Sequence, residues 1–251
     1  MVTPSLRLVI VLAVLVVIGV TAVSLARLPL GRAVVTAALR ATVQLAAVST
    51  LLVIVFTSIT WTLGYVGGML AVAAGTSARR LGAPVRRPWT VVPIAAGAGP
   101  VLGVVVGSGT VPWEPASILP IAGILLGGAM TATSLAAQRM FDELIRRTGE
   151  YEAALSLGFS PRSASLEVAR DAAGLALVPA LDQTRTVGLV TLPGAFVGVL
   201  LGGGSPAAAG AAQLLVLIGL LAAEGIAVLL TVELIARRHL LPSALAHRLP
   251  S

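Results

Sequence analysis

Residues 149–165 read GEYEAALSLGFSPRSAS, a polar stretch that divides an otherwise apolar chain. This stretch lies in a charged island, defined as Arg139 to Arg185, which holds 13 of the 27 charged residues. Apolar segments long enough to span a membrane flank the island on both sides. A polar insert of this size between two spans is a typical place for a membrane protein to meet a soluble partner.

The charged island is expected to fold as a helix, a break and a second helix. Helical periodicity runs to about Leu157, and Gly158 suits the left-handed position that follows a helix end. Ser160 and Pro161 suit the N-cap and the first position of the next helix. That helix should run to about Val178 and stop near the proline that follows. The same layout would also suit a solvated loop whose two amphipathic helices lie on the membrane.

Composition places the whole chain in a lipid bilayer. Of the 251 residues, 57% are hydrophobic and 11% are charged, whereas soluble domains carry roughly 25% charged residues. We expect an all-α integral membrane protein, a single transmembrane domain over residues 1–251. A span needs about 20 mainly apolar residues. Seven segments qualify: about 6–25, 34–56, 59–77, 89–108, 117–137, 186–203 and 209–235.

The arginines predict the orientation, because basic residues concentrate on the cytoplasmic side of membrane proteins. With the N-terminus outside, 15 of the 17 arginines fall inside, together with the charged island and the C-terminus. The net charge of +7 therefore indicates the membrane and not a nucleic-acid partner. The first segment has an alternative interpretation as a cleavable signal peptide, since Ala22-Val23-Ser24-Leu25-Ala26 suits a cleavage site.

Residue usage excludes several chemistries. All basic residues other than histidine are Arg, and a P-loop requires Lys to reach the phosphates of a nucleotide. The chain has no Cys, and both histidines, His239 and His247, lie in the C-terminal tail. We therefore expect no enzyme activity and no cofactor in this chain, and any ATP hydrolysis on another one.

The charged island resembles a known coupling element. Glu152-Ala153-Ala154, three residues and then Gly158 is similar to the EAA loop of ABC transporter permeases, in which a short helix docks into a cleft on the ATPase. At positions 168–171 the chain reads Val-Ala-Arg-Asp, where the ABC importer pattern has an apolar residue and Leu-Pro. The resemblance implies ATPase-coupling residues, which are Glu152, Ala153, Ala154, Leu155, Leu157, Gly158 and Phe159.

A longer resemblance follows. Residues 177–194, LVPALDQTRTVGLVTLPG, closely resemble the signature of the FetB-type permeases, bacterial iron exporters related to plant aluminium-tolerance permeases. RATVQL at 40–45, LPIAG at 119–123 and GGAM at 127–130 agree in order and spacing. The resemblance implies a homodimeric permease in the bacterial cytoplasmic (inner) membrane, paired with two copies of an ATPase that binds ATP and Mg²⁺. It also implies alternating-access export of a metal ion or metal complex. One departure is Gly128, where the family often has Asn.

Several residues are candidates for translocation or gating. Asp182 and Arg185 could form a structural ion pair, cap a helix, or gate the cytoplasmic mouth. Pro193-Gly194 would lie mid-span, as a hinge or as a static kink. Glu224 would lie near the middle of the seventh span, where a buried charge is costly and indicates function. It could be protonated, paired or facing a cavity, and it supports an alternative function as an ATP-independent carrier or channel.

The remaining candidates have equally plain structural explanations. Arg40 and Gln44 share a helix face and could bind an anion, although Arg40 could simply snorkel to the interface. Thr131 and Ser134, with Thr133 between them, make part of the fifth span polar, but such hydroxyls often bond their own backbone. Met130 is a possible ligand. Carboxylate, hydroxyl and amide oxygens suit Mg, Ca or Mn better than softer metals, so no transition-metal site is evident.

Overall fold

The computed structural model describes residues 5–82, 87–246 and 249. The predicted inside residues Arg86 and Arg248 and the tail residue His247 lie outside this part of the chain. The described residues are helical and form no β-sheet, with one isolated bridge between Val187 and Thr191. The prediction of an all-α membrane protein is confirmed, and the chain divides into two compact units, Met1–Ser58 and Ile59–Ser251.

The first unit is a helical hairpin of α1 (Leu6–Leu25) and α2 (Gly31–Val55). Ser5 caps α1, its side chain accepting a hydrogen bond from the Leu8 amide at 3.4 Å. Gly31 sits against Val20, 3.7 Å from where a Cβ would be, so the two helices approach closely at the turn. No residue of α1 is buried. A helix that is apolar all round and uncovered by protein belongs in lipid or against another chain.

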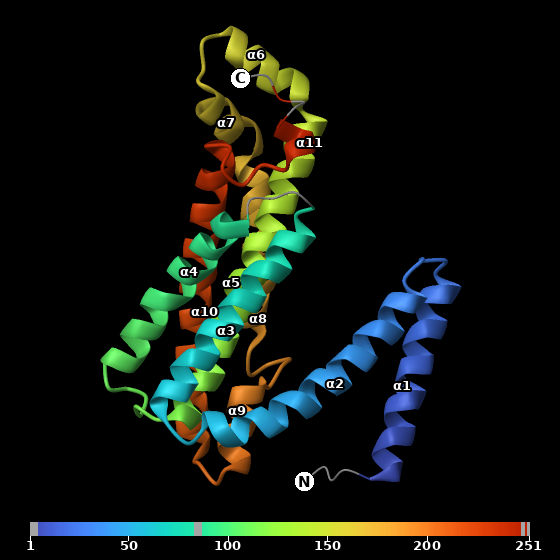
Figure 1. Ribbon diagram of the computed structural model, residues 1–251, viewed down its shortest axis with the longest axis vertical. Helices are drawn as coiled ribbons and strands as arrows, with labels where there is room; N and C mark the ends of the chain where they lie inside the picture. The colour runs from blue at the N-terminus through green and yellow to red at the C-terminus, as the bar shows by residue number, and fades with distance from the viewer. Residues whose placement is uncertain (1–4, 83–86, 247–248, 250–251) are drawn as a thin grey trace. The chain divides into compact units, whose positions relative to one another are not determined.

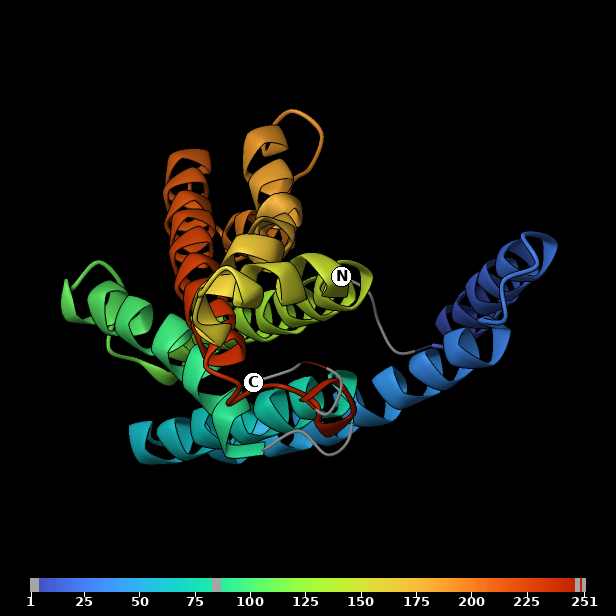
Figure 2. The same cartoon turned by 90° about the horizontal axis from the view of Figure 1, so that it is seen from above.

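The second unit is built around four long helices. These are α3 (Ile59–Arg80), α4 (Arg87–Gly107), α5 (Pro115–Arg146) and α10 (Pro206–Ala236). α4 and α5 each pack against both α3 and α10, as the view from above shows (Figure 2). At 1.5 Å per residue α5 is about 48 Å long, which exceeds the roughly 30 Å of a hydrocarbon core. Its far end therefore extends beyond the membrane.

Six helices of the described chain are long and apolar enough to cross a membrane, namely α1, α2, α3, α4, α5 and α10. They correspond to six of the seven predicted spans. The predicted span at 186–203 is wrong as a continuous helix. In its place α8 (Val178–Thr186) ends, the chain turns, and α9 (Gly194–Leu201) begins. The local reason is that Gly188 takes φ +79° and Pro193 starts a new helix with extended backbone.

This interrupted segment still follows the length of α10. α7 (Pro161–Gly174) contacts α10 near one end and α9 contacts it near the other, with the 3-10 turn Leu175–Leu177 and α8 between them (Figure 1). Backbone breaks at membrane depth are tolerated where protein or a cavity satisfies the freed polar groups. The second unit thus contains a discontinuous helix beside a continuous one.

The charged island confirms the predicted break but not the predicted second helix. α6 (Thr148–Ser156) ends in a Schellman motif in which Gly158 has φ +90°. Ser160 caps α7, accepting a hydrogen bond from Ser163 N at 3.2 Å, and Pro161 begins it. However, α7 ends at Gly174, and the predicted stop at Pro179 instead lies in the first turn of α8.

The island is also a packed structure and not a solvated loop. Tyr151 of α6 and Ala164 and Ala169 of α7 are fully buried against the end of α5. The end of α10 and the C-terminal segment with α11 (Ser243–Ala246) complete this core, which we call the polar-end core. Apolar burial fixes the direction of α6 and α7, since a helix held only by surface charges would be free to reorient.

Candidate functional site

A cavity of about 570 Å³ lies where the discontinuous helix faces α5 and α10. α9 begins beside it, so Pro193 and Gly194 line the wall. Two carboxamides, Gln183 of α8 and Gln213 of α10, supply the polar groups of an otherwise apolar lining. The other lining residues are Pro120, Ile124, Ala195, Gly198, Val216, Leu217 and Leu220. A mainly apolar cavity with a few polar groups is the usual form of a small-molecule site.

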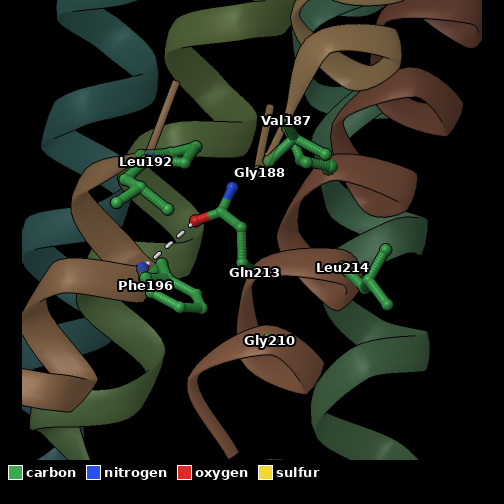
Figure 3. Close-up of a pocket in the computed structure, with 9 residues that line it drawn as sticks. Val187, Gly188, Leu192, Phe196, Gly210, Gln213 and Leu214 are labelled. Atoms are coloured by element: carbon green, nitrogen blue, oxygen red, sulfur yellow. Dashed lines mark hydrogen bonds between the residues drawn. The ribbon is translucent and has the colours of Figure 1, made fainter. Parts of the chain in front are cut away.

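Gln213 holds the start of α9. The first amides of a helix have no partner inside the helix and need one from elsewhere. The Gln213 side-chain oxygen accepts a hydrogen bond from the Phe196 amide at 3.3 Å. Both residues line a second cavity of about 300 Å³ (Figure 3). Gln213 is buried and its amide nitrogen faces the same space. Gln213 of the continuous helix α10 therefore holds the first turn of α9 through this hydrogen bond. Its amide nitrogen remains a donor that faces the 300 Å³ cavity.

Glu224 lies beyond the end of the main cavity. Leu220 and Ile124 line that end, and Glu224 and Gly128 follow them by one helical turn on α10 and α5. The Glu224 side chain is only 8% exposed. A Cβ on Gly128 would lie 2.7 Å from the Glu224 Oε1 atom. The buried carboxylate therefore rests directly on the backbone of α5.

The predicted coupling residues divide into an anchored set and an exposed set. Ala154 and Leu155 pack against the polar-end core. Leu155 is therefore partly buried within this chain and presents less surface than Leu157 or Phe159. Leu157 is 80% exposed and Phe159 is 45% exposed. Glu152, Ala153 and Gly158 are exposed beside them, so an apolar tip stands on a charged surface at the end of the second unit opposite α9 (Figure 1).

Ion pairs tie this tip to the long helices. Arg147, between α5 and α6, pairs with Glu150 and donates to the backbone oxygen of Val168 on α7 at 2.8 Å. Arg162 of α7 binds Glu233 of α10. The Arg147 guanidinium holds the pKa of the Glu150 carboxyl below its ordinary value. The Glu233 carboxylate, in turn, raises the pKa of Arg162. Sequence reasoning assigned no role to Arg162 or Glu233.

The other predicted site residues do not gather at the cavity. Asp182 and Arg185 form the expected ion pair at 3.7 Å, on an exposed face of α8. Thr131 bonds the backbone of Gly127, and Ser134 bonds that of Met130, so their hydroxyls follow the structural explanation. Met130 packs against a hydrophobic core.

Two of the predicted site residues lie in the first unit, away from the second unit's helices in sequence. Two residues that line the 570 Å³ cavity were not predicted as site residues. Arg40 and Gln44 are exposed on α2. Gln183 and Gln213 were missed, although the signal that singled out Glu224, a polar residue in an apolar span, also applies to Gln213.

No metal cage is present in the part of the chain that the structure describes: no three His, Asp or Glu residues come together there. The geometry thus defines a class: a multi-pass helical membrane protein with a cavity at a helix break and an exposed apolar tip.

Comparison with known proteins identifies the family. Residues 6–240 match the uncharacterised protein family UPF0014, and the chain belongs to that family. It is 33% identical to the UPF0014 membrane protein STAR2 of Oryza sativa subsp. japonica over 78% of this chain and 70% of that protein. It is 34% identical to the "Probable iron export permease protein FetB" of Escherichia coli over 59% of this chain and 57% of that protein.

A second plant relative matches over a shorter stretch. The Protein ALUMINUM SENSITIVE 3 of Arabidopsis thaliana is 41% identical over 42% of this chain and 39% of its own length. No solved structure matches the chain. The predicted resemblance to FetB-type permeases and their plant relatives is confirmed.

Proposed function

We propose that this chain is the membrane-spanning permease subunit of an ABC transporter, driven by ATPase subunits on separate chains. The observation that carries the proposal is the apolar tip formed by Leu157 and Phe159 on the rigidly anchored α6–α7 turn. Exposed aliphatic and aromatic side chains on a charged surface suit the groove of a protein partner. The chain has no Lys for a P-loop, so the ATP-binding partner must be another protein.

The anchoring supports a mechanical role for the tip. Tyr151, buried at 1% exposure, ties α6 to the polar-end core, and the Schellman turn at Gly158 sets the direction of α7. A push on Leu157 would therefore move α7 as a body. α7 leads through α8 into the helix break that lines the cavity. Alternating access would then follow from movement of α8 and α9 against α10.

The cargo and direction are taken from the relatives. The Escherichia coli relative carries iron export in its name, and we extend metal-ion or metal-complex export to this chain. A homodimer of this chain with two ATPases in a bacterial cytoplasmic membrane is the assembly we propose, with the charged island on the ATPase side. The uncovered apolar surface of α1 and α2 is available for lipid or a second permease subunit.

Co-purification tests the proposal. Co-expression with candidate ABC ATPases of the same genome should yield a stable complex and permease-stimulated ATP hydrolysis. The double variant Leu157→Ser with Phe159→Ser should lower recovery of the ATPase at least tenfold, with no change in the thermal stability of the permease. Leu175→Ser is a matched control, since Leu175 is 55% exposed and lies at the far end of α7, about 20 Å away. Equal ATPase recovery in wild type and double variant would contradict the proposal.

One observation favours a second function. Glu224 is a buried carboxylate in a long apolar helix, as in carriers coupled to ions or protons. A stand-alone carrier or channel would transport in reconstituted vesicles without any ATPase. Transport that depends on ATP and on the partner chain would exclude this alternative.

A further inference from the structure

Among the described residues of the second unit, Glu224 is the only carboxyl-bearing or basic side chain in the apolar interior. The sequence holds no other charged residue between Thr186 and Val232, and none between Ile59 and Ala78. Between Trp89 and Gln138 the one charged residue is Glu114, which is exposed in the loop before α5. When ionised, Glu224 therefore gives this interior a negative group with no positive one beside it. Such a field attracts cations and disfavours anions.

The Glu224 carboxylate has no hydrogen-bond or ion-pair partner among residues 5–82, 87–246 and 249, although its side chain is only 8% exposed. Leaving a buried charge without a partner costs several kcal/mol. A structural role would normally supply a donor, as Arg162 does for Glu233 nine residues further along the same helix. The vacant hydrogen-bonding capacity of Glu224 therefore indicates a ligand.

Gly128 makes the room for this carboxylate. A Cβ at position 128 would lie 2.7 Å from Glu224 Oε1 and 2.2 Å from Leu220 Cδ1. Any side chain there would displace one group or the other, because real Cβ contacts are never this short. Gly128 therefore allows both the carboxylate and the leucine to stand against α5.

Leu220 connects Glu224 to the cavity. It lines the 570 Å³ space on one side and contacts the Gly128 position on the other. Glu224 stands one helical turn beyond Leu220, towards the charged island, just outside the cavity lining. Gln213 is eleven residues away, about 16 Å along α10. The two polar groups therefore act at separate positions and do not share one ligand.

We propose that Glu224, which stands against Gly128, binds a divalent cation just beyond the end of the cavity, and that the cation keeps most of its water shell. In the described chain no three carboxylate or imidazole groups come together to replace that shell. One carboxylate with several waters suits a hard ion such as Mg²⁺ or Mn²⁺. This inference rests on the proposed transport function, in which the cavity is the substrate path, and it makes Gly128 and Glu224 the residues that select charge.

Mn²⁺ binding to the purified full-length chain in nanodiscs, without ATPase, tests the site directly by electron paramagnetic resonance. Wild type should show one saturable Mn²⁺ site per chain. Glu224→Gln should weaken binding at least tenfold, and Glu224→Asp should retain a weakened site because the charge remains. Glu114→Gln is the matched control and should bind as wild type, since that carboxylate is exposed outside the interior.

Gly128→Asn gives an independent test, since its side chain should displace the carboxylate and weaken Mn²⁺ binding with Glu224 still present. Equal Mn²⁺ affinity in wild type and Glu224→Gln, or no saturable site in wild type, would overturn the inference. Glu224-dependent binding without any ATPase association would support the site and overturn the ATPase-driven function, so the two failures are distinguishable.

Discussion

Arg162 of α7 donates two parallel hydrogen bonds to Glu233 of α10. Its Nε and Nη2 atoms each lie 2.8 Å from one of the two carboxylate oxygens. Arg237 adds a third contact to the same carboxylate, 2.5 Å from its Nε to Oε1. Two-point Arg–carboxylate contacts fix orientation as well as distance. The helix that follows the exposed tip is thus fastened to the helix that carries Gln213 and Glu224.

Arg162→Ala should uncouple the tip from α10. The pair is partly exposed, so its loss should change the stability of the fold little, while permease-stimulated ATP hydrolysis falls severalfold. Arg162→Lys should restore less than half of the stimulation, because Lys cannot make the two-point contact. Arg170→Ala serves as control, since Arg170 pairs loosely with an exposed neighbour at 3.7 Å. Stimulated activity unaffected by Arg162→Ala would argue against transmission through this contact.

Gly158→Ala should disrupt the turn between α6 and α7. A Cβ at φ +90° is strained, at a cost of about 1 kcal/mol. ATPase recovery should fall because Leu157 and Phe159 would no longer keep their relative positions. Gly149→Ala is a matched control, since Gly149 lies within α6 with open space around its Cβ position. Thermal unfolding and pull-down of both variants provide the measurement, and equal behaviour would show that the turn geometry is unimportant.

Gln213→Leu should release the start of α9. The Phe196 amide would lose its partner, which costs about 1–3 kcal/mol when the group is buried. Hydrogen–deuterium exchange should accelerate at residues 194–197 and stay unchanged in α3. Gln183→Leu, which alters the same cavity without removing that hydrogen bond, should leave exchange in α9 as in wild type. Unaltered exchange in Gln213→Leu would show that α9 is held by packing alone.

Acidification should loosen the join between α5 and α6. Hydrogen bonding to Arg147 lowers the pKa of Glu150 from its ordinary value of 4.5. A lowered carboxyl pKa contributes stability that is present above that ordinary value and is lost as the pH falls through the folded-state pKa. Protease sensitivity of the α6 region should therefore rise as the pH falls below that ordinary value. Glu150→Gln should be sensitive already at neutral pH and should change less on acidification.

Much of the fold could be predicted because it depends on local sequence. Apolar segments of sufficient length identified six long helices, and the Gly158 and Ser160-Pro161 signals placed the break in the charged island correctly. These features rest on the hydrophobicity of a segment or on the backbone preferences of two or three neighbouring residues. The same reasoning failed at 186–203, because hydropathy measures how apolar a segment is and not whether its helix is continuous.

The sequence by itself thus determined a helical membrane protein, a charged island with a defined break, and the absence of a nucleotide-binding Lys. Only the tertiary structure decided which distant residues meet: Gly128 with Glu224, Phe196 with Gln213, and Arg162 with Glu233. It also decided that Leu155 is anchored while Leu157 is exposed. The physical reason is that spacing along a helix fixes a residue's face, whereas its partner depends on how several helices pack together.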